Sequence, residues 1–331
     1  MVRFQINQDR SLRKWCLRHM TEKARAWVTV AGFGGHIKAT RTTLTVRKKN
    51  EERRYEIRDV GHLIVVGGHT IHTSAVIALL RGGASISVFD ADGRPAGQLT
   101  PPGRGDPAAE LRNAQNRAFG HTYALTFAEK AMNERLLAIE RYGHASGWDL
   151  LYEGELEFLH RSREEYQFLI KMDELRRLHQ MNTDMYYEVM GRTLPAGLGF
   201  QRRKKRPHTD PINTMLSFGY AVLYSAANVA VVAAGLDPDH GVFKEGPGGL
   251  VYDIIDGFKP TMVDEPVFAL ARTGLREEEY ETGNGRCILS ECLTSRLLPV
   301  LHRTVREERI AAVVRDLAHS LATGKTFSPV Y

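Results

Sequence analysis

Two aspartates and a run of cations are the residues of this sequence best suited to chemistry on a phosphate. Asp253 and Asp256 are three residues apart in an apolar segment, so a helix there would present both carboxylates on one face. Such carboxylates can hold a divalent cation that polarises a phosphodiester. Five consecutive cations precede them in the chain: Arg202, Arg203, Lys204, Lys205 and Arg206. Together they indicate a site for a phosphate backbone, with a solvated helix face and a solvated basic loop as the alternatives.

A long apolar helix is predicted between the cations and the aspartates. Asp210 before Pro211 marks its start, because a carboxylate accepts from the free N–H groups of a first turn and proline loses no bond there. Gly235 and Pro238 end it. The uncharged run 212–236 is also long enough to span a bilayer. Its small and polar residues favour a helix buried by its neighbours, so we predict no membrane partner.

Composition is that of an ordinary globular protein with a mild basic excess. Of 331 residues, 43% are hydrophobic and 25% charged, and the net charge of +6 permits a nucleic-acid partner without requiring one. Cys16, Cys287 and Cys292 form no CxxC pair, which indicates reduced thiols rather than a disulfide framework or a thiolate zinc site. The first residues lack the apolar core of a signal peptide, and we predict a cytoplasmic protein.

Hydrophobic periodicity predicts an α+β protein, with an N-terminal β-rich domain followed by an all-helical domain. Residues 1–25 form a basic leader, with a nucleic-acid arm as the alternative, and residues 26–100 alternate with period two. A proline- and glycine-rich linker over 101–108 separates them from a helical part over 109–331. The predicted strands are 27–30, 36–39, 43–46, 55–57, 62–66 and 85–89, with a helix over 73–81. The later helices are predicted at 108–142, 149–191, 211–235, 250–256, 261–273, 289–303 and 308–322, with a turn-rich piece over 278–287.

Several motifs in the right order carry a family resemblance. They are RKKRPHTDPINTMLSFGY (203–220), VAAGLDP (232–238), YDIIDGFKP (252–260), HLIVVGG (62–68) and SISVFDADG (85–93). Over roughly residues 26–305 the chain resembles the CRISPR-associated endonuclease/integrase family that inserts new spacers into CRISPR arrays. The resemblance implies a homodimer formed through the β-rich domain 26–100 and a helical domain that binds DNA. It also implies Mg²⁺ or Mn²⁺ as cofactor and the second CRISPR adaptation subunit as a partner.

The family's metal ligands carry over to this sequence only in part. Asp256 and Asp253 match its two acidic positions, while its glutamate falls on His179 and its histidine on Lys244. An imidazole can ligate a metal, although hard ions prefer carboxylate, and a protonated lysine has no lone pair to offer. His240 is the only nearby imidazole that could take the place of the family's histidine.

These substitutions leave two hypotheses open. In the first, Asp253, Asp256 and either His179 or His240 hold Mg²⁺ or Mn²⁺, and the chain is an active DNA endonuclease/integrase. In the second, Lys244 supplies the positive charge between the two carboxylates, and the chain binds DNA without cutting it. The lysine favours the second hypothesis.

Overall fold

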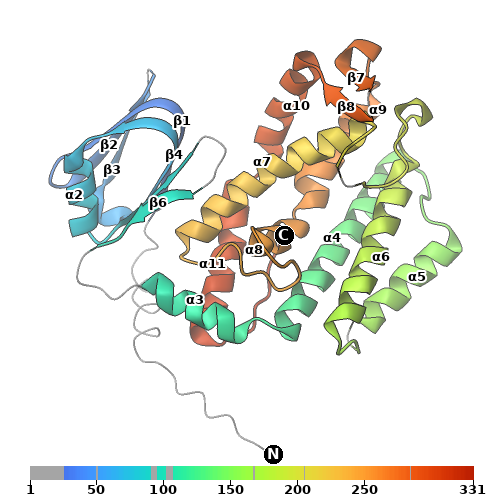
Figure 1. Ribbon diagram of the computed structural model, residues 1–331, viewed down its shortest axis with the longest axis horizontal. Helices are drawn as coiled ribbons and strands as arrows, with labels where there is room; N and C mark the ends of the chain where they lie inside the picture. The colour runs from blue at the N-terminus through green and yellow to red at the C-terminus, as the bar shows by residue number, and fades with distance from the viewer. Residues whose placement is uncertain are drawn as a thin grey trace, which may run out of the picture. The chain divides into compact units, whose positions relative to one another are not determined.

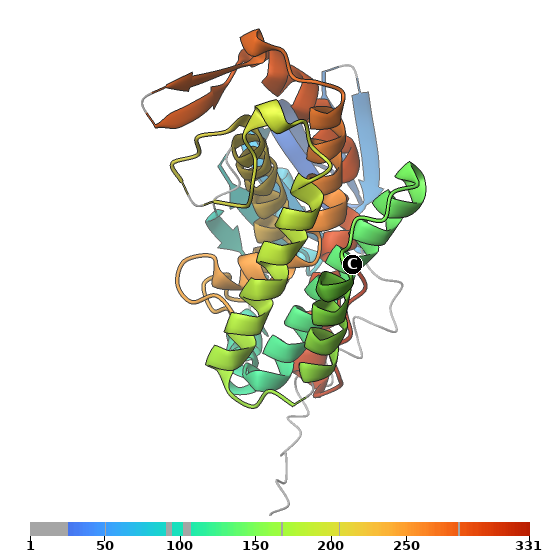
Figure 2. The same cartoon turned by 90° about the vertical axis from the view of Figure 1, so that its right-hand side faces the viewer.

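The structure is a computed structural model that describes residues 26–49, 51–90, 95–101, 107–166, 168–204, 206–283 and 285–331 (Figures 1 and 2). The predicted leader, Cys16, Lys205 and residues 102–106 of the predicted linker lie outside these ranges. A six-stranded mixed sheet is followed by a mostly helical region, so the predicted α+β class is confirmed. The domain boundary predicted over 101–108 stays a prediction.

The sheet combines strands β1 and β2, which partly alternate between buried and exposed residues, with strand β4, whose first half is largely buried. Its order is β3-β2-β1-β4-β5-β6, with β1, β4 and β5 parallel and the other neighbours antiparallel. Helix α2 (Thr73–Arg81) connects the parallel strands β4 and β5. The strands are β1 (Ala26–Ala39), β2 (Thr43–Lys48), β3 (Glu51–Glu56), β4 (Val60–Ile71), β5 (Ser85–Phe89) and β6 (Pro95–Leu99).

Two differences from the predicted strands have a physical reason. The runs predicted at 27–30 and 36–39 are parts of one strand, β1, because the glycines between them bend the strand without ending it. Gly32 and Gly34 have positive φ, and the register with β4 shifts between Phe33 and Gly35. Strand β6 was not predicted, because its sequence, PAGQL, is short and begins with proline.

The remaining elements are mainly helices, and two of the long helices predicted from the sequence are each divided into two shorter ones. Gly120 separates α3 from α4, and residues 166–171 separate α5 from α6. The turn-rich piece contains a hairpin of β7 (Tyr280–Gly283) and β8 (Arg286–Leu289). The helices are α3 (Pro107–Ala118), α4 (His121–Ser146), α5 (Glu153–Glu165), α6 (Met172–Gly191), α7 (Pro211–Ala233), α8 (Gly249–Asp256), α9 (Glu265–Arg272), α10 (Glu291–Thr304) and α11 (Glu307–Thr323).

The chain divides into two compact units. The first combines the sheet region with residues 228–238 and 314–327, so the last turn of α7 packs in it, with Ala233 in one cluster with Ile64 and Phe89. The second holds residues 119–227, 239–313 and 328–331. In this second unit, which we call the helical unit, α4 contacts α6, α8 and a π-helical turn, η3 (Pro260–Asp264).

Helix α7 begins where the sequence predicted. The backbone N–H of Asn213 donates to Asp210 Oδ1 over 2.7 Å, which caps the first turn. By length and composition α7 is the one helix of the described ranges that could cross a membrane. Its side chains Ile212, Met215 and Leu223 are instead fully buried within the chain.

Candidate functional site

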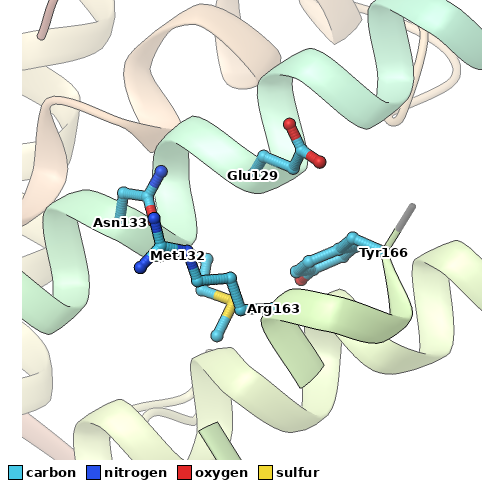
Figure 3. A pocket seen from close by; sticks show the side chains of 5 residues that line it. All are labelled: Glu129, Met132, Asn133, Arg163 and Tyr166. Carbon is cyan, nitrogen blue, oxygen red and sulfur yellow. The ribbon is translucent and has the colours of Figure 1, made fainter. Parts of the chain in front are cut away.

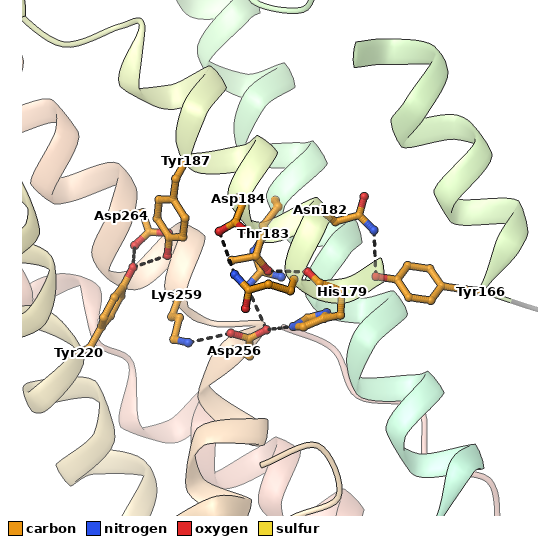
Figure 4. A network of polar contacts seen from close by, with 12 residues as sticks. Tyr166, His179, Asn182, Thr183, Asp184, Tyr187, Tyr220, Asp256, Lys259 and Asp264 are labelled. Atoms are coloured by element: carbon orange, nitrogen blue, oxygen red, sulfur yellow. Dashed lines mark hydrogen bonds and ion pairs between the residues drawn. The ribbon is translucent and has the colours of Figure 1, made fainter. Parts of the chain in front are cut away.

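Asp256, at the end of α8, is the centre of a buried polar cluster drawn from three helices and the turn after α8 (Figure 4). Arg135 of α4 donates from Nη2 to Asp256 Oδ2 over 2.9 Å, and His179 Nε2 of α6 lies 2.9 Å from the same oxygen. Lys259 Nζ donates to Asp256 Oδ1 over 2.7 Å. Both carboxylate oxygens therefore already face donors from this chain.

The cluster is electrostatically compensated. Only 4% of the Arg135 side chain and 14% of the Asp256 side chain are exposed. Burial alone would raise the pKa of Asp256, but the charges of Arg135 and Lys259 hold that pKa well below its usual range. Burial lowers the pKa of His179, so its imidazole is neutral at pH 7 and Nε2–H donates to the carboxylate.

Helix periodicity explains how these side chains meet. Arg135 lies on the face of α4 that buries Ala128, Ala131 and Ala138, where small residues leave room for its long side chain. His179 and Asn182 are three residues apart on one face of α6, and Asn182 Nδ2 donates to Tyr166 Oη over 3.0 Å. The fold thus brings His179 into contact with Asp256, and these are two of the residues that the family resemblance matches to metal-ligand positions.

Asp253 has a different role from Asp256, although both lie on α8. Its Oδ2 accepts from the backbone N–H of Val242 at 2.6 Å and of Phe243 at 2.9 Å, and its Oδ1 accepts from Lys244 N–H at 3.1 Å. Burial raises the pKa of Asp253 to about 7, against the opposing effect of these three donors. Asp253 thus fixes the segment 242–244, and the Phe243 ring packs on His179 with centroids 4.9 Å apart.

The two other predicted site residues do not pair with Asp256 in the described part of the chain. The side chain of Lys244 is exposed, and no ion pair joins it to Asp253 or Asp256 there, although its charge helps to lower the pKa of His179. The ring of His240 stacks on Phe119 at 5.6 Å. The cations that pair directly with Asp256 are Arg135 and Lys259.

Sequence reasoning missed both of these cations. Lys259 was detectable, because it follows Asp256 by three residues within a quoted motif. Arg135 carries no such signal, since it lies far from the motifs in a helix that contains a second arginine, Arg141. Only the packing of α4 against α8 places it in the cluster.

The basic segment 202–206 is divided between surface and interior. Arg202 and Arg206 are exposed, whereas Arg203 donates to Asn213 Oδ1 at 2.7 Å and to Ser217 Oγ at 2.6 Å on α7. The Lys204 N–H also donates to Asn213 Oδ1. Arg203 and the backbone of Lys204 are therefore bonded to α7, while the side chains of Arg202 and Arg206 are exposed.

A second buried carboxylate lies beside the cluster (Figure 4). Asp264 accepts from the hydroxyl of Tyr220, which in turn lies 2.6 Å from the Tyr187 hydroxyl. Burial raises the pKa of Asp264 to about 6. The Tyr220 ring also lies 5.2 Å from the Arg203 guanidinium and 5.3 Å from Lys259 Nζ, so it contacts cations of both the basic segment and the Asp256 cluster.

These side chains do not fit a divalent metal at Asp256. A cation bound to Oδ2 would face the buried Arg135 guanidinium, and one bound to Oδ1 would face Lys259, at distances where like charges repel strongly. Within the described ranges no group of three or more His, Cys, Asp or Glu side chains is arranged to hold a metal. The oxygens of Asp253 are occupied by backbone donors.

A small cavity of about 140 Å³ lies between α4 and the end of α5 (Figure 3). Glu129, Met132 and Asn133 line it from α4, and Arg163 and Tyr166 from the α5 side. None of the predicted site residues lines it. Tyr166 links the cavity to α6, because its hydroxyl accepts from Asn182 Nδ2.

Comparison with known proteins gives a consistent family. The family model of the CRISPR-associated protein Cas1 matches residues 28–302. A CRISPR-associated Cas1 protein of Methanospirillum hungatei JF-1 is 37% identical over 300 residues, which cover 90% of this chain and 99% of that protein.

Two solved structures share the fold. A casposase bound to an integration product has a TM-score of 0.77 at 19% identity over 92% of this chain and 99% of its own. A partial Cas6-RT-Cas1–Cas2 complex has a TM-score of 0.76 at 20% identity over 92% and 98%.

Proposed function

Because the chain belongs to the Cas1 family of CRISPR-associated proteins, we propose that it is a DNA-binding subunit of spacer acquisition that does not cleave DNA at Asp256. The observation that carries this proposal is the contact of both Asp256 oxygens with Arg135, His179 and Lys259. A carboxylate neutralised by the chain's own cations attracts a divalent metal only weakly. Without such a metal, the attacking and leaving oxygens of a phosphodiester lack their usual stabilisation.

DNA binding rests on the basic segment and on the net charge of +6. Arg202 and Arg206 are exposed, while Arg203 is bonded to Asn213 and Ser217 of α7. A phosphate backbone bound there would release counterions, so affinity should fall as salt rises. Contacts of this kind carry no base specificity.

The family also suggests the partners. A related Cas1 structure is solved in a complex with Cas2, which supports a Cas2-type second adaptation subunit as a partner here. The homodimer through residues 26–100 and a cytoplasmic location are proposed on the family resemblance and on composition. Size measurement of the purified protein, alone and with a Cas2-type subunit, tests both assemblies.

An active enzyme is the second candidate. It is favoured by the close approach of His179 Nε2 to Asp256 Oδ2, since an imidazole and a carboxylate are two members of an ordinary metal site. For this candidate, Arg135 and Lys259 would have to leave Asp256 before Mg²⁺ or Mn²⁺ bound.

Cleavage and integration assays on the purified protein separate the two candidates. We expect DNA binding that weakens with salt, and no strand cleavage or integration above background in Mg²⁺, Mn²⁺ or EDTA. Robust Mn²⁺-dependent cleavage that disappears in Asp256→Ala would establish the active enzyme. Charge reversal at Arg202 and Arg206 should weaken DNA binding at least tenfold, and unchanged affinity would make the segment a solvated loop.

A further inference from the structure

Of the two cations that contact Asp256, only Lys259 remains accessible to solvent. Its side chain is 19% exposed, against 4% for Arg135. An ammonium group carries three N–H donors, and the bond to Asp256 Oδ1 uses one of them. Lys259 can therefore hold Asp256 and donate to a further acceptor at the same time.

The charges around Lys259 nearly balance. Arg135 and Lys259 are positive, Asp256 is negative and His179 is neutral. Asp264, whose pKa is raised to about 6, is largely ionised at pH 7, so the sum is close to zero. The carboxylates around Lys259 are thus compensated, and its remaining N–H donors can contact an anion without facing a net negative charge.

Tyr220 places Lys259 next to the basic segment. The Tyr220 ring lies 5.3 Å from Lys259 Nζ and 5.2 Å from the Arg203 guanidinium, so the two cations are at most about 11 Å apart. Phosphates of one DNA strand follow each other every ~3.4 Å along the helix axis, so a few consecutive phosphates span this distance. A strand that contacts the exposed Arg202 or Arg206 can continue to Lys259.

From this arrangement we infer that a backbone phosphate of DNA binds directly to Lys259, and that Arg135 and Lys259 together replace the divalent cation between Asp256 and the phosphate. Arg135 neutralises Asp256 from inside, which leaves the ammonium of Lys259 for the phosphate. This inference rests on the proposed DNA binding and specifies how it occurs at the Asp256 cluster. It requires no metal, so the contact should form equally well in EDTA.

The test is the salt dependence of DNA affinity for the full chain. The probe is a fluorescein-labelled 30-base-pair duplex with single-stranded 3′ ends, titrated in EDTA between 50 and 200 mM KCl (roughly the range over which phosphate contacts are resolved). We expect Lys259→Met to lower affinity about five- to tenfold at 50 mM KCl and to reduce the slope of log K against log salt by about 1. Lys259→Arg should retain both. The control Lys171→Met removes a lysine of the helical unit that is 78% exposed, and it should change neither.

A second pair of variants distinguishes the loss of a DNA contact in Lys259→Met from a defect in folding. Asp256→Asn/Lys259→Met removes both partners of the ion pair, so no unpaired carboxylate is left, and it should bind DNA more weakly than Asp256→Asn alone. If the wild type binds DNA and Lys259→Met weakens binding neither alone nor in the Asp256→Asn background, this inference is overturned and the proposed function is unaffected. A Mg²⁺ requirement for the Lys259 contact would also overturn it. A wild-type chain that does not bind DNA would overturn the proposed function itself.

Discussion

Asp256 and Asp253 lie three residues apart on α8, yet the chain compensates their burial in opposite ways. Asp256 is surrounded by side-chain cations, and its pKa is held well below the usual range. Asp253 is surrounded by backbone N–H groups, and burial raises its pKa to about 7. The comparison shows that an acidic pair on one helix face need not be one site: Asp256 is an ionic centre, and Asp253 fixes a loop.

This difference also bears on metal binding. A carboxylate paired with two cations attracts a divalent ion only weakly, and one that accepts three backbone N–H bonds would lose some of these bonds if it turned toward a metal. The two aspartates are therefore unavailable for separate reasons. A variant that releases only one of them should not restore a metal site.

The largest effect should come from Arg135→Met. Removal of the guanidinium leaves Asp256 buried with less compensation, and we expect the free energy of unfolding to fall by about 3–5 kcal/mol, measured by urea unfolding. Arg135→Met/Asp256→Asn should recover part of this loss, because the unpaired charge is gone. Arg161→Met breaks an exposed pair with Glu157 and should cost less than about 1 kcal/mol. An equally small loss for Arg135→Met would mean that Asp256 is not an ionic centre.

Removal of Asp253, which accepts the N–H bonds of the loop 242–244, should lower the free energy of unfolding by a smaller amount. Asp253→Ala leaves the N–H groups of residues 242–244 without their partner, and we expect a loss of about 2 kcal/mol together with faster hydrogen exchange at these amides. Asp256→Ala should leave the exchange of those amides nearly unchanged. If both variants accelerated it equally, the two aspartates would act as one unit.

Much of the fold, and part of the site, could be predicted from the sequence. Asp210 and Pro211 carry a local capping signal, so the start of α7 was predicted and is confirmed. The family resemblance is likewise confirmed. The exposure of the Lys244 side chain was not predictable, because its segment is held by three backbone N–H bonds to Asp253 across a loop. Arg135 became visible only through the packing of α4 against α8, which leaves no mark in local sequence.

The pH dependence of stability sharpens the comparison further. The pKa of Asp253 is about 7 in the folded chain and about 3.9 when unfolded, so the folded chain binds the extra proton between these values. Its contribution to stability is present below pH 4 and is lost as pH rises through 7. Buried histidines with a lowered pKa, such as His179 and His62, act in the opposite sense, so the effect is read from the difference between wild type and Asp253→Asn. We expect the free energy of unfolding of the wild type to fall by about 2–3 kcal/mol relative to Asp253→Asn from pH 5 to pH 8.

Asp253→Asn removes the part of the pH dependence due to Asp253, while the parts due to the histidines and to Asp264, whose pKa is raised to about 6, remain in both proteins. Asp256 has its pKa shifted well below its usual range and contributes nothing in this window. A difference between wild type and Asp253→Asn that stays constant from pH 5 to pH 8 would contradict the assignment.

The smallest effect concerns an engineered metal site. His179→Glu/Lys244→His supplies two ligands of the family type, but Arg135 still occupies Asp256, so we expect no gain in Mn²⁺ affinity. Addition of Arg135→Met should raise that affinity about tenfold, or about 1.4 kcal/mol, in calorimetric titrations. A gain without the arginine change would show that Arg135 does not exclude the metal.

Mn²⁺ binding to the unmodified chain tests the central claim most directly. Electron paramagnetic resonance of Mn²⁺, titrated into wild-type protein and into Asp256→Asn, reports whether the carboxylate holds the ion. With Arg135 and Lys259 against Asp256, the two titrations should coincide. One tightly bound Mn²⁺ in the wild type that is absent from Asp256→Asn would contradict the account.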